Sequence, residues 1–553
     1  MDAKMNFEEF KNKWLEYLES EKKLTQEDIQ NHLDLPDNEK VELGYLIKSC
    51  RVIAVADDCY ELSALENNSK LRAGDKVLLF PSDSNKEIKA TIVDNFFNTI
   101  TLIPQTHLDN SLTYDIQITE AVMLDPLIQL VSGLEDGDTG SAFIKELCQS
   151  RQPKTKGVFG IDPQSVRLPS RLNNAQHSAI ENVLYRPSLY CIQGPPGTGK
   201  TDVLSEIAKA FSERGHEVLI ISNTHQAVNN ALNKIAKTQQ LPIVKIGEAL
   251  KAMELLSNIQ RYKTFIEYMN SRPKRRLKYE KGAIVGMTLH AAIINLGLRK
   301  KNGFAPSVVL VDEAGQIPLT FGAAIGTFGS GSIVFIGDDR QMPPIFHPML
   351  LGDELSVSIF SYITTAYPAS KIALEITYRM NDVITKFVSS HFYEPHGITL
   401  HTNNLSPAGD DSLKWIDTLS LPNASENCVE QNEVEATAIA REVSELLTAG
   451  IKPEDIAVIT PYRKQVVQLR TAMEQEGINR KVMPLVDTVE RLQGQDVDYI
   501  FISFATSVRL SNLSIDQCEF LLNPNRINVM ISRAKSFVRL YSTKQIHDAI
   551  LKI

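Results

Sequence analysis

The spacing of apolar residues changes character near residue 50 and again near residue 171. From Phe7 to about Ile47 apolar side chains recur every three to four residues, which predicts helix. From about Arg51 to Val122 the apolar runs are short and are separated by clusters of Asn, Asp, Ser and Gly, which is typical of a small β-barrel. The strands predicted for this barrel are RVIAVA, DKVLLF, KATIVDN, TITLIP and TYDIQIT.

The second change is to alternating strands and helices. From about Arg171 continuous apolar runs alternate with amphipathic helices, as expected for a parallel sheet buried on both faces. The first series of strands is LYCIQ, EVLIIS, AIVGMT, SVVLVDE and SIVFIGD. A second series starts near Lys371 with KIALEI, DIAVIT, MPLVDT, DYIFISF and FVRLYS. We therefore predict an α/β fold of two tandem doubly wound parallel-sheet domains, preceded by a helical stalk and a small β-barrel.

These changes of pattern predict five segments. The stretch RQPKTKGVFGIDPQ contains Pro and Gly and is expected to be a linker that precedes the first α/β domain. The predicted boundaries are 1–50 for the N-terminal helical segment, 51–125 for the barrel, 126–170 for a stalk helix and the linker, 171–368 for the first α/β domain with a basic insertion near 250–281, and 369–553 for the second.

Composition narrows the class of protein by exclusion. The chain of 553 residues is 43% hydrophobic and 23% charged, which excludes a collagen-like, mostly disordered or coiled-coil chain. Its apolar runs are too short to cross a bilayer, and its start, MDAKMNFEEF, does not resemble a signal peptide, so no membrane association is expected. The six cysteines have no CxxC spacing, which disfavours a disulfide framework or a zinc site and favours the cytoplasm as the compartment.

Charge divides the chain unevenly. The net charge is -9, but the first 150 residues hold 14 Lys and Arg against 28 Asp and Glu, while the remainder is net positive. The second part therefore attracts phosphate mildly, and the acidic N-terminal block is a possible docking face for a protein partner.

The clearest chemical motif is GPPGTGKT at residues 194–201. It matches G-x-x-x-x-G-K-[ST] and stands between a predicted strand, YCIQ, and a predicted helix, DVLSEIAKAF, which is the context that a phosphate-binding loop requires. Its glycines allow backbone N–H groups to surround phosphate oxygens, Lys200 can reach the β- and γ-phosphates, and Thr201 can offer a hydroxyl to Mg²⁺. A glycine-rich turn that binds nothing is the alternative. The predicted nucleotide-binding residues of this loop are Gly194, Pro195, Pro196, Gly197, Thr198, Gly199, Lys200 and Thr201.

A pair of carboxylates follows the strand SVVLV. Asp312 at the strand end can hold Mg²⁺, and Glu313 can orient and deprotonate a water molecule. This pairing favours hydrolysis of the nucleotide over transfer of its phosphoryl group to a metabolite. The alternative is that both carboxylates cap the helix that follows.

Six motifs in this order resemble those of the superfamily 1 helicases, in the branch that holds the up-frameshift helicase and senataxin. They are GPPGTGKT, DEAGQ, GDDRQMPP, TYRMN, TVERLQGQD and NRINVMISRAK, and they extend from about Arg171 to the C-terminus. The resemblance implies two RecA-like domains that hydrolyse ATP to ADP and phosphate with Mg²⁺. It also implies movement along single-stranded DNA or RNA, in the 5′ to 3′ direction.

The resemblance assigns roles around the nucleotide to five further residues. Gln176 corresponds to a glutamine that pairs with adenine, and Tyr378 to a tyrosine that stacks on it. Gln341 and Arg379 correspond to residues at the γ-phosphate, and Arg533 to an arginine finger. In the QGQD motif the resemblance implies a tight turn at Gly494 and a contact of Asp496 with the ribose, where many relatives have Glu.

Contacts with nucleic acid are predicted on both α/β domains. The stretch ISNTHQAVNNAL resembles a helicase motif that holds the strand backbone, and its Thr-His pair is more similar to the DNA-replication nuclease-helicases. Threonine hydroxyls at strand ends suit phosphate contacts, although helix N-caps are an alternative for each of them. The predicted nucleic-acid residues are Thr224, His225, Asn229, Thr288, Pro461, Tyr462, Thr488 and Arg491.

Residues 261–281 form a basic run. Its cations are interleaved with Tyr262, Phe265, Tyr268 and Tyr279, a combination that suits phosphate attraction and base stacking on a single strand. The alternative is a solvated helix face whose aromatic residues pack inward.

Two functions remain open from the sequence. The first is an ATP-dependent helicase or translocase, and the second is an ATPase switch that clamps and releases nucleic acid or a partner without unwinding. No segment outside the α/β domains shows carboxylates at the spacing of a nuclease.

Overall fold

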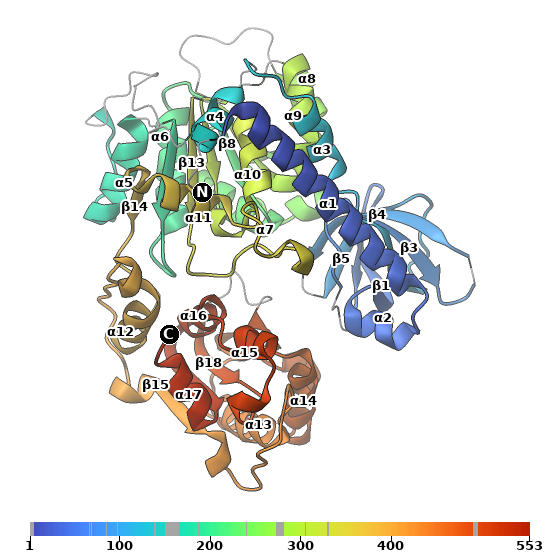
Figure 1. Ribbon diagram of the computed structural model, residues 1–553, viewed down its shortest axis with the longest axis vertical. Coiled ribbons are helices and arrows are strands. Elements are labelled where there is room, and N and C mark those ends of the chain that lie inside the picture. The colour runs from blue at the N-terminus through green and yellow to red at the C-terminus, as the bar shows by residue number, and fades with distance from the viewer. Residues whose placement is uncertain are drawn as a thin grey trace. The chain divides into compact units, whose positions relative to one another are not determined.

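The chain folds into two compact units in the computed structural model (Figure 1). Unit 1 comprises Met1–Ile192, Thr201–Gly337 and Pro344–Ile372, and unit 2 comprises Gln193–Lys200, Asp338–Pro343 and Ala373–Ile553. The structure describes residues 5–553 except 66, 68, 85, 97, 138–139, 150–164, 186–187, 239, 273–280, 303, 305, 329–330 and 490–495. The predicted linker RQPKTKGVFGIDPQ lies outside the described residues.

The N-terminal segment is helical, as the three-to-four spacing predicts. Helix α1 (Phe7–Leu33) starts with a capping box, in which Asn6 accepts a hydrogen bond from the Glu9 backbone and Glu9 accepts one from that of Asn6. Its apolar face, which includes Phe10 and Trp14, is buried in the main core of unit 1. Helix α2 (Asp37–Leu43) ends at Gly44, whose φ of 83° requires the left-handed conformation.

The predicted barrel is present and closed. Its six antiparallel strands have the order β1-β2-β5-β4-β3-β6 around a core of its own. They are β1 (Leu46–Ala56), β2 (Cys59–Ser63), β3 (Lys76–Pro81), β4 (Ile88–Phe96), β5 (Thr99–Pro104) and β6 (Thr113–Glu120). The sequence did not predict β2, because only Asp57 and Asp58 separate it from β1. Asp57 has a φ of 55°, and Asp is one of the few residues that tolerate this conformation in a tight turn.

An eight-stranded sheet forms the α/β part of unit 1, in the order β10-β9-β11-β8-β12-β13-β7-β14. Its strands are β7 (Leu189–Gln193), β8 (Val218–Ser222), β9 (Ile243–Ile246), β10 (Gln260–Tyr262), β11 (Ile284–Thr288), β12 (Val308–Val311), β13 (Ser332–Gly337) and β14 (Lys371–Ala373). The pairs from β10 to β13 are all parallel. The accompanying helices are α3 (Asp125–Ser132), α4 (Ser141–Gln149), α5 (Asn174–Tyr185), α6 (Lys200–Ser212), α7 (His225–Ala236), α8 (Phe265–Ser271), α9 (Leu289–Asn302), α10 (Leu319–Ile325) and α11 (Ile359–Ala366).

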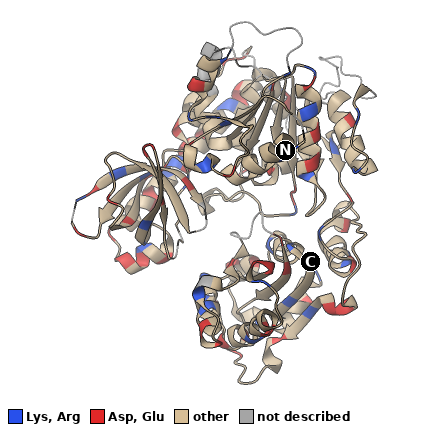
Figure 2. Ribbon diagram, turned by 180° about the vertical axis from the view of Figure 1, so that it is seen from behind, with Lys and Arg blue, Asp and Glu red and all other residues tan. Residues whose placement is uncertain are grey.

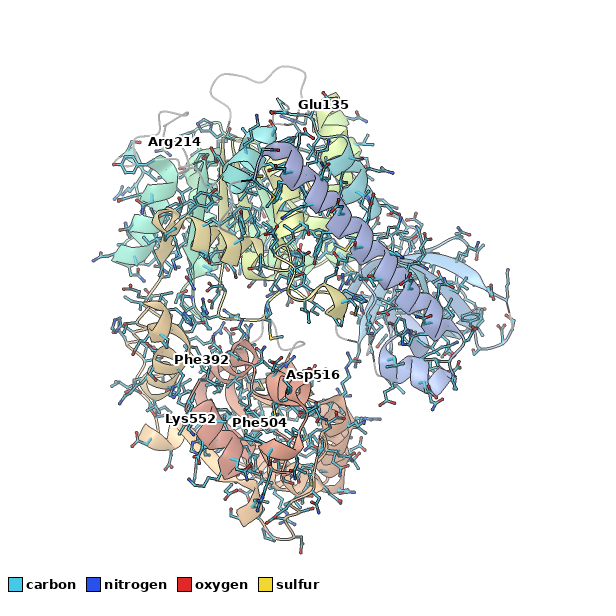
Figure 3. The ribbon with its side chains drawn as sticks, in the orientation of Figure 1. Glu135, Arg214, Phe392, Phe504, Asp516 and Lys552 are labelled. Carbon is cyan, nitrogen blue, oxygen red and sulfur yellow. The ribbon has the colours of Figure 1, made fainter. Side chains whose placement is uncertain are left out.

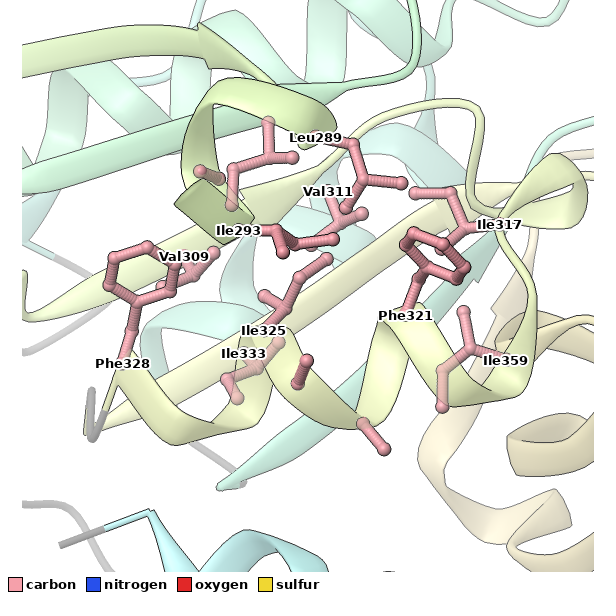
Figure 4. Packing of buried hydrophobic residues seen from close by; sticks show 14 of the residues in the cluster. Leu289, Ile293, Val309, Val311, Ile317, Phe321, Ile325, Phe328, Ile333 and Ile359 are labelled. Carbon is pink, nitrogen blue, oxygen red and sulfur yellow. The ribbon is translucent and has the colours of Figure 1, made fainter. Parts of the chain in front are cut away.

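The core of this α/β part lies between the sheet and its helices (Figure 4). Ile293 of α9 and Phe321 of α10 pack over Val309 and Val311 of β12, and all four side chains are at most 4% exposed. Burial of such side chains stabilises the fold by roughly 1.5 to 3 kcal/mol each. The continuous apolar strands of the sequence are therefore explained by burial on both faces of the sheet.

The prediction that KIALEI begins the second sheet was wrong. Only Lys371–Ala373 forms a strand, and this strand, β14, lies next to β7 at the edge of the first sheet. The backbone N–H of Leu374 then donates to the carbonyl of Gln193 at 2.8 Å. An apolar run shows that a strand is buried, but which sheet it joins depends on residues far away in the sequence.

The sheet of unit 2 has five parallel strands in the order β15-β19-β18-β16-β17. They are β15 (Leu413–Asp417), β16 (Ile456–Thr460), β17 (Leu485–Thr488), β18 (Val497–Ser503) and β19 (Ala534–Ser542). The helices are α12 (Asp382–Val388), α13 (Glu433–Thr448), α14 (Arg463–Gln475), α15 (Ile515–Leu521), α16 (Pro524–Ser532) and α17 (Lys544–Ile550). Phe392 and Phe504, labelled in Figure 3, belong to one of its two apolar clusters. The predicted fold class, two parallel α/β sheets with a helical stalk and a barrel, is confirmed.

Candidate nucleotide and nucleic-acid sites

The loop after β7 has the backbone of a phosphate-binding loop. Gly197 and Gly199 have φ angles of 74° and 81°, which side-chain-bearing residues rarely adopt. A Cβ atom on Gly194 would lie 2.3 Å from Cγ of Lys200, and one on Gly197 would lie 2.5 Å from Cβ of Arg379. Only glycine therefore fits at these positions. Left-handed glycines just before a helix N-terminus are the backbone arrangement of a phosphate-binding loop, which fits the nucleotide that the motif predicts.

Lys200 lies at the first position of α6. Its ammonium group donates to the Gly194 carbonyl at 2.6 Å, so the side chain folds back across the loop. Thr198 also holds the loop, because its hydroxyl donates to the Pro195 carbonyl at 2.7 Å. Thr201 follows in the first turn of α6 and is half-buried. The loop is preformed, and its cation lies beside the glycines.

The TYRMN segment lies directly on this loop. Thr377 donates its hydroxyl hydrogen to the carbonyl of Pro196 at 2.9 Å, and the Tyr378 backbone N–H donates to the Gly197 carbonyl at 2.9 Å. The side chain of Tyr378 is 52% exposed. Thr377 was not singled out from the sequence, and its position just before the Tyr-Arg pair is the only signal that could have suggested it.

Two predicted arginines meet at one carboxylate. Nη2 of Arg379 lies 2.6 Å from Oδ1 of Asp496, and Nη1 of Arg533 lies 4.0 Å from the same oxygen. Nη1 of Arg379 also donates to the carbonyl of Ser532, the last residue of α16, at 3.0 Å. The structure thus brings Arg379, Arg533 and Asp496 together beside the glycine loop. Asp496 contacts both arginines, and the ribose contact that the family resemblance implies for it stays a prediction.

The GDDRQ segment belongs to the same group. Nε2 of Gln341 donates to Oδ2 of Asp338 at 2.7 Å, and Nε2 of Gln193 donates to Oδ1 of Asp339 at 2.6 Å. Burial raises the pKa of Asp338, and the charge of Lys200 opposes this shift. Gln193 and Asp338 are therefore part of the site, although the sequence suggested only Gln341.

The carboxylate pair follows β12 in unit 1. Asp312 is 5% exposed, and its Oδ1 accepts a hydrogen bond from the Glu313 backbone at 3.0 Å. Glu313 has a φ of 53°, a strained conformation for a residue with a side chain. Within the part of the chain that the structure describes, Glu313 makes no side-chain cap to the 3₁₀ turn Ala314–Gln316 that follows. The capping alternative therefore does not hold for Glu313.

Gln176 has a local structural role. Its side-chain oxygen accepts from the Asn173 backbone at 3.0 Å, while Asn173 accepts from the Gln176 backbone at 2.9 Å. This reciprocal pair caps the N-terminus of α5 and buries Gln176 to 2% exposure. Spacing of Asn and Gln three residues apart is the sequence signal of such a box, and it was missed. Gly494 and Arg491 lie outside the described residues.

The predicted threonines lie at or just after strand ends in each sheet. Thr288 at the end of β11 lies opposite Ser222 of β8, two residues before Thr224, and Thr488 of β17 lies opposite Thr460 of β16. The hydroxyls of Thr224 and Thr288 accept from the backbones of Ala227 and Ala291 at 3.2 and 3.3 Å, so both act as N-caps. The strand ends are adjacent as predicted, but these two hydroxyls already have backbone partners.

His225 and Asn229 are buried rather than presented to a strand. His225 is 9% exposed, and burial together with the charges of Lys245 and Lys251 lowers its pKa well below its usual value. Asn229 is 5% exposed and donates to the carbonyl of Lys251 at 2.8 Å. Asn229 thereby holds the segment that follows β9.

Tyr462 lies in an aromatic group on unit 2. Its ring packs 5.5 Å from that of Phe520, and the guanidinium of Arg526 lies 3.8 Å from the Phe520 ring centre. Pro461 beside it is buried. Phe520 was not predicted as a site residue, because a single phenylalanine in a helix carries no signal of its surroundings.

The basic run is largely neutralised where the structure describes it. Lys263 pairs with Asp58 of the barrel and with Glu248, and Arg272 pairs with Glu217. Phe265 and Tyr268 are buried in the main core of unit 1. The alternative of inward-packed aromatics therefore holds for 261–272, while 273–280 lie outside the described residues.

The acidic N-terminal block supplies part of this neutralisation. Lys251 lies 3.3 Å from Glu61 and 3.0 Å from Asp94, both on barrel strands. Figure 2 shows acidic and basic positions interspersed along the ribbon of this part of the chain. At least three barrel carboxylates thus face cations of the same unit.

None of the helices among the described residues is long and apolar enough to span a bilayer.

Comparisons with known proteins agree with the motifs. Two family models, both described as AAA domain, match residues 171–281 and 355–544. The "DNA replication ATP-dependent helicase/nuclease dna2" of Schizosaccharomyces pombe is 27% identical over 418 residues, which cover 70% of this chain and 28% of that protein. The "DNA replication ATP-dependent helicase/nuclease DNA2" of Bos taurus is 26% identical over 585 residues, covering 94% and 53%.

A third relative is named for nonsense transcripts rather than for DNA replication. The "Regulator of nonsense transcripts 1 homolog" of Arabidopsis thaliana is 27% identical over 443 residues, which cover 70% of this chain and 33% of that protein. The chain therefore spans 28% to 53% of the length of these relatives. The ordered motifs, the two parallel sheets and the two AAA-domain matches agree with one another. The chain belongs to the superfamily 1 DNA/RNA helicases, a family of ATP-hydrolysing enzymes, in the branch that includes the up-frameshift and DNA2 helicases.

Proposed function

We propose that the chain is an ATP-dependent helicase or translocase that hydrolyses ATP to ADP and phosphate while it moves along single-stranded nucleic acid. The observation that carries the proposal is that Lys200 folds across the glycine loop while Arg379, which packs against Gly197, shares Asp496 with Arg533. Several cations beside a preformed phosphate loop suit a transferring γ-phosphoryl group, whose charge spreads over its oxygens. The direction, 5′ to 3′, is the one that the family resemblance implies.

The chain's own residues divide the work of hydrolysis. Lys200 binds the β- and γ-phosphates, and Tyr378, half exposed beside Gly197, stacks on the adenine. Phosphate oxygens replace Asp496 as the partner of Arg379 and Arg533, since both guanidinium groups already reach one carboxylate oxygen. Gln341 exchanges Asp338 for the terminal phosphate.

Glu313 is the proposed general base. Its strained backbone, with φ of 53°, sets the direction in which its side chain leaves the end of β12. A carboxylate positioned in this way can orient a water molecule and accept its proton as the water attacks phosphorus. Hydrolysis then depends on a group from the end of this strand, and not only on nucleotide binding.

Thr201 and Asp312 are the residues that would hold Mg²⁺. The hydroxyl and the carboxylate are hard oxygen ligands of the kind that Mg²⁺ prefers, and both belong to unit 1. The bound ion would neutralise charge on the β- and γ-phosphates. Asp312 is 5% exposed, which agrees with a ligand that is fixed in place before the nucleotide binds.

Single-stranded nucleic acid is proposed to run over the strand ends that carry the predicted threonines. Thr288 in unit 1 and Thr460 and Thr488 in unit 2 mark these ends, and because their side chains are at most 7% exposed, the contacts would be made by the exposed backbone and side chains beside them. Phosphates can bind to such strand ends without regard to base sequence. The names of the relatives include both DNA replication and nonsense transcripts, so the proposal covers DNA and RNA.

Steady-state ATP hydrolysis and strand separation test the proposal together. We would compare the wild type with Glu313→Gln and, as a matched control, with Glu181→Gln, which changes an exposed glutamate of α5. Each protein is measured alone, with single-stranded DNA and with single-stranded RNA of the same sequence.

We expect hydrolysis that one polymer stimulates, loss of hydrolysis by at least about a hundredfold in Glu313→Gln, and unwinding of a duplex with a 5′ overhang. Stimulated hydrolysis without unwinding would favour the ATPase switch instead. Absence of hydrolysis in the wild type would overturn the proposal.

A further inference from the structure

A buried hydrogen-bonded group in unit 2 joins the GDDRQ segment to the helix that carries Arg533. Asp338 is 4% exposed, and its Oδ2 accepts two hydrogen bonds, from Gln341 at 2.7 Å and from the hydroxyl of Tyr393 at 2.6 Å. Its Oδ1 accepts a third from the Arg340 backbone at 3.1 Å. The buried carboxylate therefore has several donors, as a charge removed from water requires.

Tyr393 carries the connection onward. Its side chain is fully buried, and its oxygen accepts from Nδ2 of Asn528 at 3.0 Å while its hydrogen goes to Asp338. Asn528 lies in α16, and its Nδ2 also donates to the Arg340 carbonyl at 2.7 Å. Arg533 follows the last residue of this same helix. The chain of side chains is thus Gln341, Asp338, Tyr393 and Asn528.

The backbone that places Tyr393 is unusual. Ser389–Tyr393 forms a turn of π-helix directly after α12, and such turns occur frequently at functional sites. Burial and the nearby charge of Asp338 raise the pKa of Tyr393 well above its usual value, so the hydroxyl remains a donor throughout the physiological range. Its hydrogen bond to Asp338 is therefore available whatever Gln341 does.

Gln341 and Tyr393 both donate to the same oxygen, Oδ2 of Asp338. The amide of Gln341 can leave Asp338 for a phosphate oxygen only if the carboxylate remains hydrogen-bonded after it has left. Tyr393 supplies that remaining donor from the hydroxyl side, and the Arg340 backbone supplies another. Without the hydroxyl, Asp338 would hold Gln341 more tightly.

We infer that Tyr393 is a positioning residue for ATP hydrolysis: its hydroxyl holds Asp338 so that Gln341 can exchange this carboxylate for the terminal phosphate, and through Asn528 it links the exchange to the helix that carries Arg533. The inference rests on the proposed function, because it assigns a role within the same nucleotide site. Tyr393 itself touches neither the nucleotide nor the attacking water in this scheme.

Tyr393→Phe tests the inference, because it removes the hydroxyl and keeps the ring. We expect kcat for ATP hydrolysis to fall roughly tenfold, while KM for ATP stays within about twofold. Tyr541→Phe is the matched control, since Tyr541 is another buried tyrosine of unit 2 whose hydroxyl donates to a carboxylate, that of Glu442. The control should leave both constants unchanged.

A double-mutant cycle separates positioning from folding. In a Gln341→Ala background, Tyr393→Phe should change kcat by less than about twofold, because the residue through which it acts has gone. A tenfold fall in that background as well would show independent effects and would overturn the inference. An unchanged kcat in Tyr393→Phe alone would also overturn it.

The midpoint of thermal unfolding shows whether Tyr393→Phe is folded. If it is not, Asn528→Ala tests the same inference. It removes the donor to the Tyr393 hydroxyl, so its effect on kcat should likewise vanish in the Gln341→Ala background. An additive effect overturns the inference while leaving the proposed function intact. A wild type that does not hydrolyse ATP overturns both, and this is seen before any variant is compared.

Discussion

The glycine loop and the segment after β8 differ in how their predicted site residues are placed in the structure. Around the glycine loop in unit 2, predicted residues from four distant segments have partners within the unit: Lys200 bonds to Gly194, Arg379 and Arg533 share Asp496, and Gln341 bonds to Asp338. After β8 in unit 1, the predicted nucleic-acid residues His225 and Asn229 are instead buried against neighbouring segments.

The difference follows from the kind of signal. The glycine loop is defined by its backbone conformation, and glycine is the residue that suits its φ angles and close approaches. The spacing of the glycines in the sequence therefore predicts the geometry of the loop directly. Cations and polar side chains near β8 and β9 carry no such constraint. Their partners include Glu61 and Asp94 of the barrel, about 150 residues or more away in the sequence.

The largest effect should come from Lys200→Ala at the glycine loop. Removing the ammonium group leaves the β- and γ-phosphates without their point charge, and we expect ATP hydrolysis to fall by at least about a hundredfold. Lys452→Ala, on an exposed lysine of unit 2, is the control. Initial rates of ATP hydrolysis are measured for both variants. Equal rates in the two would show that the glycine loop does not bind the nucleotide as proposed.

Arg533→Lys should come next. A lysine keeps the charge but not the planar pair of donors, so hydrolysis should fall by roughly a hundredfold although nucleotide binding remains. Asp496→Asn, which removes the shared carboxylate, should change kcat much less. Single-turnover hydrolysis and nucleotide titration separate the two effects, and equal losses in both variants would contradict the proposed replacement of Asp496 by phosphate.

The region after β8 should respond to pH through Lys245. This lysine is 1% exposed, no described residue hydrogen-bonds its ammonium group, and burial lowers its pKa from 10.5 to about 7. Because the unfolded chain holds this proton up to pH 10.5 and the folded chain releases it near 7, Lys245 makes stability rise with pH between these values. The slope is at most about 1.4 kcal/mol per pH unit.

Lys245→Met should remove that slope. The free energy of unfolding of the variant, measured by denaturant titration at several values between pH 7 and 10, should gain on the wild type toward pH 7 and lose this advantage toward pH 10. A parallel pH dependence in the two proteins would show that Lys245 does not titrate in this range.

The smallest effect is expected where the barrel meets Lys251. Asp94→Asn weakens one of two ion pairs that are about one-fifth exposed or less, and should lower the free energy of unfolding by about 1 kcal/mol or less. It should also free positive charge and tighten binding of single-stranded nucleic acid by a few-fold at low salt. Fluorescence anisotropy at two salt concentrations checks this, with Asp548→Asn on α17, beyond the barrel, as control.

Local patterns predicted much of the fold. The helical spacing from Phe7 and five of the six barrel strands follow from periodicity, and the strand before each motif follows from its continuous apolar run. The short strand β2 was missed because it follows a two-residue turn, and β14 was assigned to the wrong sheet because its place depends on its neighbour β7. At the predicted nucleotide site, the sequence likewise did not show that the side chain of Gln176 completes the cap of α5.

By itself the sequence determined the phosphate loop, the carboxylate pair and the order of the helicase motifs, because each rests on residue types at short, fixed spacings that local backbone conformation enforces. Only the tertiary structure decided that Arg379 and Arg533 share Asp496, that Tyr393 and Asn528 join Asp338, and that barrel carboxylates neutralise Lys251 and Lys263. These contacts join residues that are tens to hundreds of positions apart. Their physical cause is the free-energy cost of burying a charge without a partner, and packing rather than sequence distance decides which partner lies within reach.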